Sequence, residues 1–148
     1  MRVLIATLLC LAATPALADE CDMLIARVMN ETGAAVDQRS SDFASFTAGS
    51  GISLTFSCGA PEASSVGAQF RGEGPPDVYY VLFGKAGHAV TGLTAATIEA
   101  AARRAQEAAS RLRHSNVDES GARITCSVSN SEKGRLTMCA VIEHSERG

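Results

Sequence analysis

LTAATIEAAARRAQEAASRLRH, residues 93–114, is the stretch of sequence that decides the fold. Its apolar residues recur at helical spacing and form one stripe: Ile98, Ala101, Ala102, Ala105, Ala109 and Leu112. Thr94 occupies the N-cap position, and Leu93 and Ile98 stand where a hydrophobic staple would place them. The stretch therefore predicts a long helix. Because the stripe is mostly alanine, the helix must lie close against a broad surface.

Strands before and after this helix can supply that surface. The clearest is residues 52–58, where Ile52, Leu54, Phe56 and Cys58 alternate with hydroxyl residues, as in an antiparallel sheet with one solvated face. Further runs predict strands at residues 42–48, 66–71 and 78–83, and a terminal hairpin at 124–130 and 135–143. Residues 34–41 are interpreted as a polar linker, and residues 84–92, with their three glycines, as a loop.

Residues 21–31 predict a first, shorter helix, because Leu24, Ile25, Val28 and Met29 lie on one side and Gly33 offers a stop. The predicted fold class is α+β, with a twisted antiparallel sheet of about five to six short strands. The long Ala-rich helix and the shorter N-terminal helix are expected to pack on one face of that sheet. Residues 19–148 are expected to form a single domain.

The chain begins with features typical of a secretory signal peptide. Arg2 gives a positive start, a short apolar run follows, and residues 16–18 read Ala-Leu-Ala. We therefore expect residues 1–18 to be cleaved, taking Cys10 with them, and the mature protein to be periplasmic or secreted. The apolar run is shorter than the roughly 20 residues that span a bilayer, and we expect no membrane span in the mature chain.

Four cysteines remain in the mature chain: Cys21, Cys58, Cys126 and Cys139. An even number in an exported protein predicts disulfides. A four-residue loop at 131–134 sets Asn130 opposite Arg135 and hence Cys126 opposite Cys139, near enough to bridge. The remaining pair is Cys21 with Cys58. Two metal-binding thiol pairs are the alternative, but they lack a Cys-x-x-Cys spacing, and we expect no metal.

The charge pattern argues against a nucleic-acid partner. The formal net charge of the chain is −3, whereas nucleic-acid binding requires a basic surface. On the long helix Glu99, Arg103, Glu107 and Arg111 alternate in sign at four-residue spacing. Each such pair contributes roughly 0.2–0.5 kcal/mol, and the acids dilute any basic patch there.

His88 and Lys85 are the candidate ligand-binding residues within the glycine-containing stretch 84–92. A histidine there could act as a general base, for example with Asp77, or contact an anion with Lys85. The ordinary interpretation is an exposed loop histidine. The sequence contains no nucleophile elbow and no Ser-x-x-Lys motif, so we assign no catalytic residue and no cofactor.

Hydroxyl residues form a second candidate surface. Ser53, Thr55 and Ser57 share one side of the strand at 52–58, with Ser45 and Thr47 as possible neighbours. In the terminal hairpin, hydroxyl residues share a face with apolar ones: Thr125, Ser127, Ser129, Leu136, Met138, Ala140 and Ile142. If the two faces coincide, the surface suits a protein partner. The interpretation that we favour is simpler: the first helix covers the apolar half of this face.

The sequence favours an exported, non-catalytic binding or accessory domain that acts through an envelope or secreted protein partner. Two alternatives stand beside this hypothesis. One is a small envelope hydrolase that uses His88. The other is a secreted enzyme inhibitor that presents the turn at residues 72–77.

Overall fold

The computed structural model describes residues 16–59 and 64–144. The chain folds into an α+β structure, as predicted. Its elements, in order, are α1 (Ala16–Thr32), β1 (Ala35–Arg39), β2 (Phe43–Thr47), β3 (Ile52–Ser57), β4 (Ser65–Arg71), α2 (Asp77–Thr91), α3 (Ala95–Leu112), β5 (His114–Glu119), β6 (Ala122–Ser131) and β7 (Gly134–Glu143). The predicted signal peptide lies outside the described residues except for residues 16–18, and its cleavage stays a prediction.

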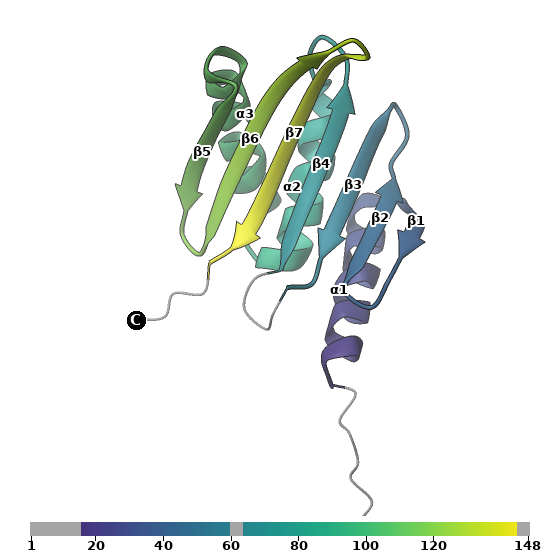
Figure 1. Ribbon diagram of the computed structural model, residues 1–148. Helices are drawn as coiled ribbons and strands as arrows, with labels where there is room; N and C mark the ends of the chain where they lie inside the picture. Colours follow the sequence, from purple (N-terminus) through teal and green to yellow (C-terminus); the bar gives the residue numbers. More distant parts are fainter. Residues whose placement is uncertain (1–15, 60–63, 145–148) are drawn as a thin grey trace, which may run out of the picture.

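The strands form a single sheet in the order β1-β2-β3-β4-β7-β6-β5, and every neighbouring pair is antiparallel. β1–β4 make one meander and β5–β7 make another, and the two join where β4 pairs with β7. In Figure 1 all three helices lie behind the sheet. The sheet therefore has one helix-covered face and one open face.

The core lies between the helices and the covered face of the sheet. α3 begins as predicted, with the backbone N–H of Thr97 donating to Thr94 Oγ1 at 3.1 Å. The predicted stripe of α3 is buried except for Leu112, which is 72% exposed because the helix ends there. Its alanines allow a close approach to β6, and Cys126 Sγ lies 3.6 Å from Ala102 O.

Residues 78–83 were predicted to form a strand, and this prediction is wrong. They form the first half of α2, which continues through the expected loop to Thr91. Most of α2 is covered, since Tyr79, Tyr80, Leu82, Phe83, Ala86 and Ala89 are buried, and one stripe with Val78, Val81, Lys85 and His88 is exposed. Packing on the sheet and on α3 thus outweighs the local preference of aromatic and β-branched residues for strands.

The sheet has seven strands rather than five to six, and residues 16–59 and 64–144 contain three helices rather than two. The expected linker at residues 34–41 contains the edge strand β1, whose residues are all exposed and therefore carry no buried-exposed alternation. The second additional strand, β5, forms the opposite edge and pairs with β6.

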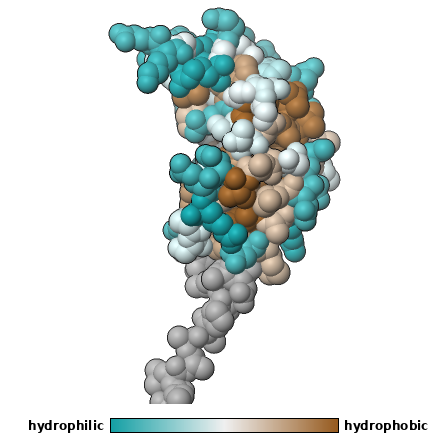
Figure 2. All heavy atoms as spheres, turned by 90° about the vertical axis from the view of Figure 1, so that its right-hand side faces the viewer, coloured by the Kyte–Doolittle hydropathy of each residue, from teal (hydrophilic) through white to brown (hydrophobic). Residues whose placement is uncertain are grey.

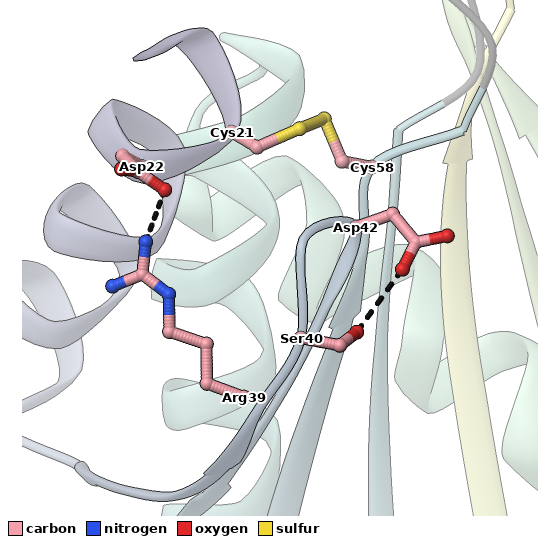
Figure 3. The surroundings of a disulfide bond; sticks show 6 residues. All are labelled: Cys21, Asp22, Arg39, Ser40, Asp42 and Cys58. Carbon is pink, nitrogen blue, oxygen red and sulfur yellow. Dashed lines mark hydrogen bonds and ion pairs between the residues drawn. A yellow bond between two sulfur atoms is a disulfide. The ribbon is translucent and has the colours of Figure 1, made fainter. Parts of the chain in front are cut away.

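Both disulfides join the expected cysteines. Cys126 faces Cys139 across the β6–β7 hairpin, where Asn130 also faces Arg135. Cys21 joins α1 to Cys58, directly after β3, and Arg39 of β1 reaches Asp22 nearby, as Figure 3 shows. Two disulfides indicate that the chain folds in an oxidising compartment.

Candidate functional site

The open face of the sheet carries regular rows of side chains, because neighbouring strands are in register. The central row crosses all seven strands: Gln38, Ser45, Thr55, Gly67, Ala140, Thr125 and Asn116. The row on one side includes Ser57, Ser65 and Ile142, and the row on the other side includes Ser53, Gln69, Met138 and Ser127. Hydroxyl residues of the two meanders thus share one surface.

A shallow groove of about 250 Å³ lies at the middle of this face, over β4 and β7. Its floor is formed by Gly67 and Ala140, the smallest side chains of the central row, which face each other across the two strands. A Cβ atom on Gly67 would lie only 2.7 Å from Thr55 Oγ1. Glycine at this position therefore keeps the groove open.

The groove lies within a surface without charged side chains, which we call the open-face patch. It consists of Ser45, Thr47, Ser53, Thr55, Ser57, Ser65, Gly67, Gln69, Thr125, Ser127, Met138, Ala140 and Ile142. Charged residues make up 20% of the whole chain, so their absence from this surface is a local property. Met138 and Ile142 are 40% and 38% exposed, respectively.

Charges appear at the margins of the patch. Arg71 lies at the end of β4, and Arg123 of β6 bonds Asp118 of β5 at 2.7 Å. The hydrogen bond from Arg123 lowers the pKa of the Asp118 carboxyl below its ordinary value. The pair is therefore charged at neutral pH and marks the β5 side of the patch.

The structure answers the question that the sequence left open about these two faces. Ser53, Thr55 and Ser57 lie on the same face as the hydroxyl and apolar residues of the β6–β7 hairpin. The favoured interpretation, in which the first helix covers the apolar half, is wrong, because α1 lies behind the sheet with α2 and α3 (Figure 1).

His88 and Lys85 lie elsewhere, on the exposed surface of α2 rather than in a loop. His88 Nδ1 is 2.8 Å from Leu93 O, a contact that links the end of α2 to the start of α3. A hollow beside His88 is shared with Arg27 and Glu31 of α1. Asp77 begins the same helix three turns earlier, roughly 16 Å away along its axis. The acid-base pair considered for a hydrolase is therefore not brought together.

A second apolar surface lies at the β1 edge. Figure 2 shows this side of the molecule, where hydrophobic and hydrophilic areas alternate. α1 and β1 lie on this side (Figure 1), and Met23 and Met29 of α1 and Val36 of β1 have exposed side chains. The Arg39–Asp22 ion pair also joins these two elements, so this surface lacks the continuous uncharged character of the open-face patch.

Within residues 16–59 and 64–144, no three His, Cys, Asp or Glu side chains gather in a way that could hold a metal ion. None of the helices in this described part is long and apolar enough to cross a membrane. No protein-family model, curated protein or solved structure matches this chain. The site must therefore be interpreted from its own geometry.

Gln69, Gly67 and Ser65 were not among the residues singled out from the sequence. All three belong to the open-face patch because β4 pairs with β7. The alternation of residues 66–71 predicted a strand but gave no partner for it. Pairing between strands that lie some 70 residues apart leaves no local signal in a single sequence.

Proposed function

We propose that this protein is an exported, non-catalytic binding domain, periplasmic or secreted, which binds a protein partner through the open-face patch. The observation that carries the proposal is the uncharged centre of the open face, bordered by charged residues. Depletion of charge at the centre, with a polar and charged rim, is the usual anatomy of a protein–protein interface.

The composition of the patch indicates the chemistry of the partner. Thr55, Thr125 and Gln69 around the groove offer hydrogen-bonding groups that a partner must satisfy when water is removed. Met138 and Ile142 offer exposed apolar area on either side of Ala140. The complementary surface is therefore an uncharged segment of a protein that places a small apolar side chain in the groove and hydrogen-bonds to the hydroxyl groups around it.

The proposed export rests on two observations. The first 18 residues have the pattern of a cleavable signal peptide, and the fold contains two disulfides. A small domain with two disulfides and a broad open sheet is a suitable scaffold for binding outside the cytoplasm.

Site-specific photo-crosslinking tests the proposal. A photoreactive amino acid replaces Thr55 on the open face in one variant and Lys85 on the exposed surface of α2 in the matched control. Both are produced with their own leader in the native host. We expect one protein to crosslink at position 55 and not at position 85. The purified partner should then bind the wild type, and Thr125→Lys should weaken binding at least tenfold by burying an unpaired charge.

Crosslinks to the same protein from both positions, or none from position 55, would contradict the proposal. Adducts of twice the protein's own mass would assign the open-face patch to self-association instead. Circular dichroism of Thr125→Lys checks that the exposed substitution leaves the fold intact, so that lost binding reports on the surface itself.

A further inference from the structure

A second hollow, unrelated to the open-face patch, lies where the C-terminal end of α3 meets the β6–β7 hairpin. It has a volume of about 290 Å³. Three arginines line it, Arg111 and Arg113 from the end of α3 and Arg135 from β7, together with Ser110, Ser129 and Asn130. We call it the arginine pocket. These residues come from two segments that are distant in sequence, the end of α3 and the β6–β7 hairpin, and the fold brings their side chains together.

The pocket is strongly cationic, although the whole chain has a net charge of −3. None of its lining residues carries a carboxylate. Arg111 alone pairs with an acid, Glu107 at 2.9 Å, and both partners are more than 70% exposed, so that pair is weak. Among the described residues, no acid pairs with Arg113 or Arg135. Three guanidinium groups against one carboxylate leave two positive charges without compensation.

Arg135 has a further unusual property. Its Nε atom is buried and has no hydrogen-bond partner. The one other buried side-chain polar atom without a partner in the described residues is Thr137 Oγ1, two residues along the same face of β7. Buried donors are nearly always satisfied in folded proteins. Both exceptions therefore lie on the helix-facing side of β7, and one belongs to a residue that lines the pocket.

Arginines at the end of a helix also have an ordinary role, because they interact favourably with the helix dipole. That role accounts for Arg111 and for Arg113, which adopts the left-handed C-cap conformation at φ 69°. It does not account for Arg135, which belongs to a strand. It also gives no reason for a donor atom of Arg135 to be buried without a partner.

We propose that the arginine pocket binds a phosphate group, either as a free ion or as a monoester. Guanidinium groups bind phosphate oxygens through paired, charge-assisted hydrogen bonds. A phosphomonoester carries about −1.5 to −2 charges at pH 7, close to the two uncompensated positive charges of the pocket, whereas a carboxylate carries one. The guanidinium groups of Arg111, Arg113 and Arg135 would donate to the phosphate oxygens, and the hydroxyl and amide groups of Ser129 and Asn130 lie at the same pocket.

Nuclear magnetic resonance tests this site. The full mature chain is titrated with inorganic phosphate at constant ionic strength, and the amide and Arg Nε–H signals are followed. We expect saturable shifts of Arg135 Nε–H and of the amides at residues 128–130. Arg135→Gln should weaken binding at least tenfold. The matched control Arg104→Gln, which removes an exposed arginine of α3 paired with Glu119, should leave the affinity unchanged.

Glu107→Gln gives a second, opposite readout, because it frees Arg111 and should tighten phosphate binding a few-fold. Absence of saturable shifts, equal effects of the Arg135 and Arg104 variants, or equally strong binding of acetate would overturn the proposal. Sedimentation with vesicles separates the two sources of the group. Co-sedimentation with phosphatidic acid vesicles, but not with phosphatidylcholine alone, assigns a lipid monoester, whereas phosphate binding without co-sedimentation assigns a soluble ligand.

Discussion

At the scale of single residues, Tyr79 makes the most informative contact in the core. Its side chain is fully buried, and its hydroxyl donates to Ala68 O of β4 at 2.9 Å. Its ring packs edge-on against Phe70 and Tyr80, with centroids 6.5 Å and 5.2 Å away. Tyr79 therefore fixes α2 on the sheet by both apolar packing and a hydrogen bond.

Tyr79→Phe should lower the free energy of unfolding by about 1–3 kcal/mol, because it leaves the buried Ala68 carbonyl without this donor. Urea unfolding followed by circular dichroism measures the change. Tyr80→Phe is the control, since Tyr80 contacts Arg103 through its ring face at 4.3 Å and keeps that contact as phenylalanine. Equal losses in the two variants would show that the hydrogen bond to β4 contributes little.

The ionisation of Tyr79 is also expected to lower the stability of the folded state at alkaline pH. Burial raises the pKa of Tyr79 well above its ordinary value of 10.0. The folded state thus keeps a proton that the unfolded state releases, so the stability is fully present below about pH 10 and falls as the pH rises further. Urea midpoints between about pH 8 and pH 11 should show this decline, and Tyr79→Phe should flatten it. An unchanged slope in the variant would assign the decline to other groups.

At the scale of elements, α2 owes its position to two glycines. A Cβ atom on Gly84 would lie 2.6 Å from Ala95 O, and one on Gly87 would lie 2.8 Å from Ile98 Cδ1 and 3.0 Å from Val141 Cγ1. Gly84 therefore allows α2 to approach α3 closely, and Gly87 allows α2 to approach both α3 and β7. Because both glycines lie on the buried faces of α2, neither neighbour can move away easily.

Gly84→Ala should destabilise the fold by about 1–3 kcal/mol through overpacking. A loss of stability would identify overpacking as the cause, because alanine in a helix is otherwise favoured over glycine by about 0.8–1.0 kcal/mol. Thermal unfolding of the variant gives the answer. Gly74→Ala, where nothing lies within 4 Å of the added Cβ, should leave the melting temperature nearly unchanged. A stabilised Gly84→Ala variant would mean that α2 and α3 are loosely packed.

The same glycines explain why α2 was not predicted from the sequence. The six residues 78–83 are too few to show a helical period, and Gly84 and Gly87 after them are typical of a loop. Over the full length of α2, Tyr79, Phe83, Ala86 and Val90 recur at helical spacing and are buried. α3 was predictable because its stripe is long and its cap at Thr94 is local.

At the scale of the whole molecule, the Cys21–Cys58 disulfide holds α1 to the rest of the fold. Its sequence separation is 37 residues, against 13 for Cys126–Cys139. In the chain-entropy model these bridges contribute about 4 and about 3 kcal/mol, respectively. The longer bridge is therefore the one that secures a whole element.

Replacing Cys21 and Cys58 with alanine should cost about 4 kcal/mol and expose the backbone of α1 to exchange. Hydrogen exchange with mass spectrometry measures protection along the chain. The control replaces Cys126 and Cys139 with alanine, which should cost about 3 kcal/mol and leave α1 protected, because the hairpin keeps its ladder of hydrogen bonds. Equal loss of α1 protection in both variants would mean that the fold opens as one unit.

The candidate site shows how far sequence alone could reach. The hydroxyl residues of β3 and the mixed face of the β6–β7 hairpin were each predicted, since alternation and a four-residue loop are local features. The hydroxyl residues of β3 and the mixed face of the hairpin form one surface only because β4 pairs with β7. The arginine pocket depends on α3 ending above Arg135, which periodicity likewise cannot indicate.

The position of β7 also has a consequence for biosynthesis. Residues 134–143 occupy the middle of the sheet, between β4 and β6. Until they have emerged from the ribosome, β1–β4 and β5–β6 have no strand that pairs one group with the other. The native sheet can therefore be completed only after β7, the last strand of the described chain, has been synthesised.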